Sequence, residues 1–167
     1  FAAWPPLYAV AFSGFYLAML VLLLSLILRP VGFKFRGKLD GTRWHNSWDT
    51  ALFIGGLVPA LVYGVAFGDV LQGVPFRFDE TLRMTYEGSF FGLFNPFALL
   101  CGLVSVAMIT MHGATWLAVK TVEPVRNRAW RAAGVAGVAL IVLFFAGGIW
   151  ASGLDGYALR HFAGENG

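Results

Sequence analysis

A stripe of polar and sulfur-bearing side chains runs through the otherwise apolar stretch NPFALLCGLVSVAMITMHGATWLAVKT at residues 95–121. The stripe consists of Cys101, Ser105, Met108, His112 and Thr115. Their spacings of four, three, four and three residues place all five on one face of an α-helix. Such a face is either a set of catalytic or ligating groups, or the side on which a buried helix meets its neighbours.

The residue types favour helix packing over chemistry. The chain has one cysteine and three histidines, so it cannot build a disulfide or a cysteine-based zinc or iron–sulfur site from its own residues. Only His112 lies within an apolar stretch, where an imidazole can act as an axial haem ligand, a proton relay or a hydrogen-bonded packing residue. No second histidine or methionine at a matching depth completes a ligand set. We therefore predict no catalytic, cofactor-binding or metal-ligating residue, and a packing role for the stripe.

The composition indicates a membrane protein. The chain is 58% hydrophobic and 13% charged, with a mean hydropathy of +0.71. Long apolar segments predict an all-α, integral-membrane helical bundle with four transmembrane helices, at about residues 7–28, 50–68, 96–118 and 132–153. The segments lack the alternating pattern of a transmembrane barrel. We expect residues 1–167 to form one membrane domain, and the opening FAAWPPLY is typical of the interior of a longer protein.

The distribution of charge predicts the orientation of the helices. Basic residues concentrate in the first and third connections, as Arg29, Lys34, Arg36, Lys38 and Arg43, and as Lys120, Arg126, Arg128 and Arg131. By the positive-inside rule, loops 29–49 and 119–131 are cytoplasmic. The interfacial or loop segment 69–95, including the acidic loop 69–88, and both chain ends then lie on the outer side. Membrane topology and anionic lipid account for the net charge of +3, so we expect no nucleic-acid partner.

Capping residues predict where two helices begin. Asn95 is a good N-cap and Pro96 suits the first helical position of the third helix. Asn46 and Asp49 form a similar signal for the second helix. His45 and Asp49 could also form a relay pair at helical spacing, although a capped helix end is the simpler interpretation.

Several motifs together resemble subunit II of the cytochrome bd-type quinol oxidase family, including its cyanide-insensitive members. They are FSGFYLAMLVLLLSLILRPVGFKFR, RWHNSWD, GVAFGDVLQGVPF, the NPF segment described above and GIWASGLDGY, and they occur in order from about residue 1 to residue 157. The resemblance covers about four of the eight helices expected for the family. It therefore identifies the chain as a central fragment of the subunit.

The resemblance implies a part in a terminal oxidase that oxidises quinol and reduces oxygen to water in a respiratory chain of the bacterial plasma membrane. In this family haem b and haem d belong mainly to the larger, haem-bearing subunit I. Subunit II stabilises that partner and, in some members, binds a structural quinone. This fragment would then have subunit I and membrane lipid as its partners, and no cofactor of its own.

Two residues depart from the pattern of the family that the chain resembles. Asp69 stands where asparagine is expected, and His112 stands where glutamine or another polar residue is common. An exchangeable residue at position 112 favours packing over haem ligation. The alternative to an oxidase subunit is a segment of a helical transporter, suggested by Pro59 and by glycine-interrupted helices. A transporter interpretation is weakened by the absence of a charged residue at mid-membrane depth in the four predicted helices.

Overall fold

The structure is a computed structural model that describes residues 5–73, 76–78, 84–86 and 90–154. Both chain ends and part of the predicted outer loop 69–88 (residues 74–75, 79–83 and 87–88) lie outside the described residues. The placement of the chain ends and of that loop on the outer side of the membrane therefore remains a prediction.

Five α-helices and three short elements make up the described part. The helices are α1 (Pro5–Gly14), α2 (Tyr16–Arg36), α3 (Thr42–Gln72), α4 (Pro96–Lys120) and α5 (Val125–Ser152). Between α3 and α4 lie the antiparallel strands β1 (Phe76–Phe78) and β2 (Met84–Tyr86) and the 3-10 helix η1 (Phe90–Phe94). By length and composition, α2, α3, α4 and α5 can each cross a membrane. The prediction of an all-α membrane bundle with four such helices is confirmed, with one two-stranded ribbon added.

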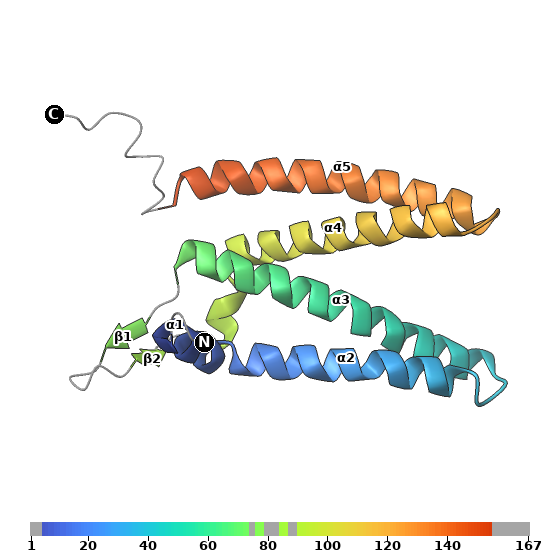
Figure 1. Ribbon diagram of the computed structural model, residues 1–167, viewed down its shortest axis with the longest axis horizontal. Helices are drawn as coiled ribbons and strands as arrows, with labels where there is room; N and C mark the ends of the chain where they lie inside the picture. Colours follow the sequence, from blue (N-terminus) through green and yellow to red (C-terminus); the bar gives the residue numbers. More distant parts are fainter. Residues whose placement is uncertain (1–4, 74–75, 79–83, 87–89, 155–167) are drawn as a thin grey trace.

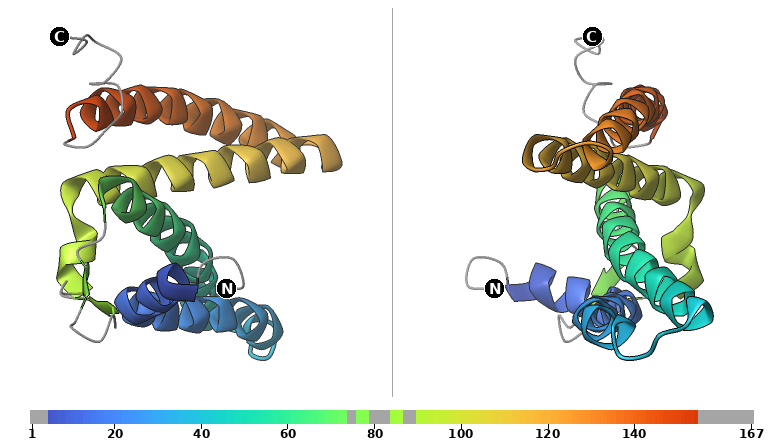
Figure 2. Two further views of the ribbon diagram at one scale, coloured as in Figure 1. Left: turned by 60° about the vertical axis from the view of Figure 1, so that its left-hand side comes forward. Right: turned by 90° about the vertical axis from the view of Figure 1, so that its right-hand side faces the viewer.

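The four long helices form an open row. Helix α3 packs between α2 and α4, and α5 packs on the far side of α4 (Figure 1). The views in Figure 2 show α3 crossing from the α2 layer to the α4–α5 layer, so the row does not close on itself. The α2–α3 and α4–α5 turns lie at one end, whereas α1, the β-ribbon and η1 lie at the other (Figure 1).

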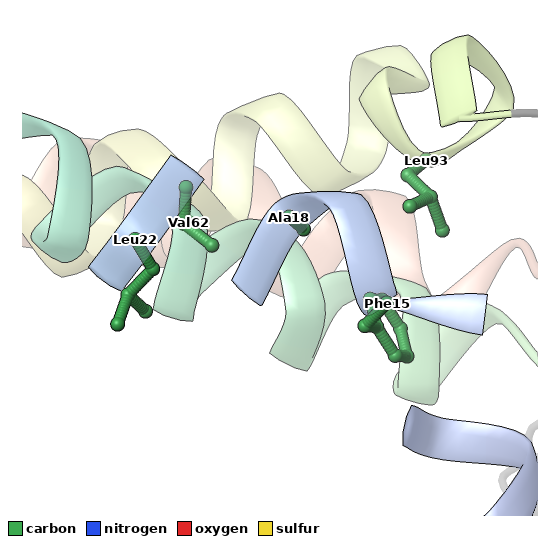
Figure 3. Close-up of a cluster of buried hydrophobic side chains, with 5 residues drawn as sticks. All are labelled: Phe15, Ala18, Leu22, Val62 and Leu93. Atoms are coloured by element: carbon green, nitrogen blue, oxygen red, sulfur yellow. The ribbon is translucent and has the colours of Figure 1, made fainter. Parts of the chain in front are cut away.

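A small apolar core joins the start of α2 to the middle of α3 and to η1. Its buried members are Phe15, Ala18, Leu22, Val62 and Leu93 (Figure 3). Among the described residues, no large side chain is more than 98% buried. The core is therefore shallow, and most of the apolar surface of the helices is left for lipid or for other protein.

The first predicted helix differs from the observed structure. Instead of one helix over residues 7–28, the chain forms α1 and α2, separated at Phe15. Helix α2 then continues past Pro30 to Arg36, because the chain packs closely against α3 there. A β-carbon built on Gly32 would lie 2.8 Å from Cδ2 of Leu52, so this turn of α2 is held by its neighbour as well as by its own backbone bonds.

The predicted start of the second helix is wrong. Helix α3 begins at Thr42 after Gly41, whose position has no side-chain capping bond, and Asn46 lies inside the helix. The earlier start is supported by a hydrogen bond across the α2–α3 turn, which Nε1 of Trp44 donates to the carbonyl oxygen of Phe35 at 2.9 Å. This contact stabilises the chain one turn before the predicted cap.

Asp49 accordingly has a different role from those predicted. It accepts hydrogen bonds from Arg36 and forms an ion pair with it, so it neither caps α3 nor forms a hydrogen-bonded relay with His45. The pair ties the end of α2 to α3. Both side chains are about half exposed, and an exposed pair of this kind contributes little to stability.

Candidate functional site

Helices α3 and α4 approach each other closely where they cross. A β-carbon built on Gly64 would lie 2.5 Å from the carbonyl oxygen of Cys101 and 2.6 Å from Cβ of Ser105. One turn further along α3, a β-carbon on Gly68 would lie 2.7 Å from Cα of Ala98. No L side chain fits at either glycine unless the helices move apart. Small residues on both helices therefore set this crossing, as is common where membrane helices pack.

The five stripe residues do not share one environment. Cys101 and Ser105 are half-buried at the crossing with α3, whereas Met108, His112 and Thr115 are exposed. The hydroxyl group of Thr115 donates a hydrogen bond to the carbonyl oxygen of Met111 in the same helix at 2.8 Å. His112 makes no hydrogen bond to the residues that the structure describes. A packing role for the whole stripe stays a prediction, and its exposed half is available to other helices.

An apolar groove runs along the same face of α4. It has a volume of about 470 Å³ and lies between α3 and α5, with part of α4 as its floor. Aromatic side chains, Phe67 and Phe144 among them, line its sides, while Gly148 leaves room on α5. Cys101, Ser105 and Met108 also line it. The groove offers hydrocarbon contact and almost no polar group, so it suits an apolar chain or helix rather than a polar substrate.

A polar pair, with Asp69 buried and Asn95 half-buried, joins the end of α3 to the start of α4. Asp69 is 5% exposed, and its Oδ1 accepts a hydrogen bond from Nδ2 of Asn95 at 2.9 Å. The other carboxyl oxygen, Oδ2, is buried and has no hydrogen-bond partner in the described part of the chain. Asn95 also accepts a bond from the backbone N–H of Ala98 at 2.7 Å, so its predicted role as N-cap of α4, with Pro96 at the first position, is confirmed.

One amide side chain thus performs two structural tasks. The Asn95 amide accepts a hydrogen bond from a backbone N–H group in the first turn of α4. It also donates a hydrogen bond to the buried carboxyl group of Asp69 on α3. The sequence predicts the cap, and it marks Asp69 as unusual. It contains no local signal that residues 26 positions apart meet, so the contact between Asp69 and Asn95 could not be predicted from it.

A comparison with known protein families decides the assignment. The model of the family described as cytochrome bd terminal oxidase subunit II matches residues 1–162. The chain belongs to this family. A subunit 2 of the cytochrome bd-I ubiquinol oxidase of Escherichia coli K12 is 53% identical over 171 residues, which cover 99% of this chain and 45% of that protein. The resemblance read from the motifs is confirmed.

Two further subunit II relatives agree with the assignment. The probable cytochrome oxidase subunit 2 of Haemophilus influenzae is 52% identical, over 98% of this chain and 44% of its own length. The cytochrome bd ubiquinol oxidase subunit 2 of Bacillus subtilis is 34% identical, over 87% of this chain and 43% of its own. The chain therefore spans less than half the length of these relatives.

A bd oxidase is a haem-containing complex, but the described residues of this subunit II chain do not supply a pair of axial haem ligands. His45 lies in the first turn of α3, and His112 lies on an exposed face of α4. Met108 shares that face and helix, so it cannot reach the opposite side of an iron held by His112. Among the described residues, no three histidine, cysteine, aspartate or glutamate side chains are grouped as metal ligands.

Proposed function

We propose that this chain is part of the scaffold subunit of a bd-type terminal oxidase, which stabilises the haem-bearing subunit I. The observation that carries the proposal is the family match over residues 1–162, combined with the open row of four helices. In the most apolar stretch of α5 only 11% of the residues are buried, whereas 39% are buried in the corresponding stretch of α3. Helices that cover one another so little leave apolar surface for lipid and for a partner subunit to cover.

The complex would couple oxidation of a quinol to reduction of oxygen to water. Its haem b and haem d would be carried by subunit I, which is consistent with the poor fit of His45 and His112 to a haem. Quinol and oxygen would be substrates of the complex rather than ligands of a site on this chain. The relatives in Escherichia coli and Bacillus subtilis are named as ubiquinol oxidase subunits, which supports quinol as the electron donor.

The proposed location is the bacterial plasma membrane, with loops 29–49 and 119–131 in the cytoplasm. The α2–α3 turn and the α4–α5 turn, which these basic segments contain, lie at the same end of the helix row (Figure 1). Two loops on the same side of a membrane must be arranged in this way. The outer side would carry segment 69–95 and the fragment ends.

The proposal is tested by expressing the full-length parent subunit with and without its co-expressed subunit I. We expect the subunit purified alone to contain no stoichiometric haem, and the co-expressed pair to contain haem in fixed ratio. His112→Gln should leave the haem absorption bands of the pair unchanged, because the residue is not expected to ligate iron. Stoichiometric haem in the subunit alone, lost on His112→Gln, would contradict the scaffold role.

A further inference from the structure

The carboxyl group of Asp69 is buried in surroundings that do not favour a charge. Asp69 lies in the last turn of α3, and 5% of its surface is exposed. Its Oδ1 accepts a hydrogen bond from Nδ2 of Asn95, and its Oδ2 has no partner in the described part of the chain. A buried charge without full hydrogen bonding is strongly destabilising, whereas an unsatisfied neutral group costs far less. The burial therefore favours the protonated, neutral carboxyl group.

Among the side chains that the structure describes, the basic ones lie far from Asp69. On α3 itself they are confined to the first turn. The first basic residue of α2 is Arg29, which packs beside Gly55, about 21 Å back along α3 from Asp69. The first basic residue of α4 is His112, about 21 Å beyond Ala98, and η1 has no ionisable side chain. The other ionisable side chains that α2, α3 and α4 carry at this end are not basic, and they are Tyr16, Tyr63 and Cys101.

The start of α4 offers few hydrogen-bond donors to an ionised Asp69. Pro96 has no N–H group. The N–H groups of Ala98 and Leu99 already bind the side chain and the backbone carbonyl of Asn95, respectively. Only the N–H group of Phe97 is left in this turn, and it makes no bond to Oδ2 of Asp69. The positive end of the helix therefore does not complete the hydrogen bonding of the carboxyl group.

Close packing beside Asp69 keeps water from the carboxyl group. A β-carbon built on the neighbouring Gly68 would lie 2.7 Å from Cα of Ala98 and 3.1 Å from Sγ of Cys101. Ala98 itself is fully buried. Hydration of an ionised Asp69 thus requires the end of α3 and the start of α4 to move apart.

We propose that Asp69 is a proton-binding site that controls the junction between the end of α3 and the start of α4. With the proton bound, the neutral acid stays buried and accepts the hydrogen bond of Asn95. When the proton leaves to the solvent, the carboxylate takes up water and the two helix ends separate. Under the proposed orientation this junction lies on the outer side of the membrane, where it would respond to the external pH. The proposal rests on contacts within this chain and does not depend on the oxidase function.

The direction of the pH dependence follows from the burial of the neutral form. Asp69 is protonated in the closed junction and ionised in the open one, so rising pH favours opening and falling pH favours closure. The change begins above the ordinary aspartate pKa of about 3.9 and continues until the buried group itself ionises. An exposed aspartate is already ionised above about pH 5 and gives no such change.

Hydrogen–deuterium exchange in the purified, full-length complex measures the opening. We expect protection factors, which correct for the pH dependence of chemical exchange, to fall about 10-fold between about pH 5 and about pH 7.5 at residues 68–72 and 97–101. Asp69→Asn keeps the acceptor for Asn95 but cannot ionise, so its protection should stay constant over this range. Asp40 is an exposed residue of the α2–α3 turn, and the control variant Asp40→Asn should keep the wild-type profile.

Infrared spectroscopy reads the protonation state directly. At about pH 5 the wild type should show the C=O stretch of a carboxylic acid that shifts in D2O and is missing from Asp69→Asn. Absence of this band, or a wild-type exchange profile that matches Asp69→Asn, would overturn the proposal. Failure of Asp69→Asn to assemble would also overturn it, because asparagine keeps the hydrogen bond and removes only the charge. Neither readout involves haem, so a haem-free preparation would refute the oxidase assignment alone.

Discussion

Replacing Gly64 with leucine is expected to prevent normal packing of α3 on α4. The nearest atoms to a β-carbon at this position belong largely to the backbone of α4, including the carbonyl oxygen of Cys101 at 2.5 Å. A backbone cannot rotate away as a flexible side chain can. The helices must separate, and overpacking of this kind typically costs about 1–3 kcal/mol. We expect a lower midpoint of thermal unfolding and a lower yield of intact complex in size-exclusion chromatography.

Gly56 provides the control on the same helix. A β-carbon built there meets no atom within 4 Å, so Gly56→Leu adds the same side chain without the clash. The account expects Gly56→Leu to assemble close to wild-type yield. Equal losses for Gly56→Leu and Gly64→Leu would show that leucine is harmful anywhere on α3, and that the crossing at Gly64 is not special.

Replacing Asn95 with alanine is expected to produce the second large effect. The variant loses the N-cap of α4 and removes the hydrogen bond to Oδ1 of Asp69, leaving a buried carboxyl group without the donor it now has. Loss of a cap costs about 1 kcal/mol, and an unsatisfied buried group adds about 1–3 kcal/mol. The thermal unfolding midpoint of the purified complex should therefore fall clearly.

A double-mutant cycle with Asp69→Ala separates the two contributions. Once the carboxyl group is gone, Asn95→Ala should cost only about the 1 kcal/mol of the cap. Asn127, an exposed residue near the start of α5, serves as the control, and Asn127→Ala should leave the unfolding midpoint unchanged. Strictly additive effects of Asn95→Ala and Asp69→Ala would show that the two side chains are not coupled.

The number and type of the long helices could be predicted because apolar runs of this length are stable in only a few forms in a membrane. The ends of the helices could not be predicted equally well. Helix α3 has 31 residues, more than a hydrocarbon core of about 30 Å needs. Its first turns are formed by contacts with α2, and these contacts leave no periodic signal in the α3 sequence.

Among the candidate site residues, features that depend on neighbouring residues in the sequence could be predicted, whereas contacts between different helices could not. The cap formed by Asn95 and Pro96 is encoded within three residues and was predicted. The stripe on α4 follows from helical spacing, but spacing does not say which members meet α3. The structure places Ser105 against Gly64 and leaves His112 exposed. The contact between Asp69 and Asn95 depends on how two helices cross, which a single sequence does not encode locally.

The most direct test of the oxidase assignment is a reduced-minus-oxidised absorption spectrum of the tagged full-length protein. It should be purified in mild detergent with whatever accompanies it, alongside a gel of the co-purified subunits. The account predicts haem b and haem d bands that travel with a larger second subunit. A preparation without haem and without a second subunit would contradict it.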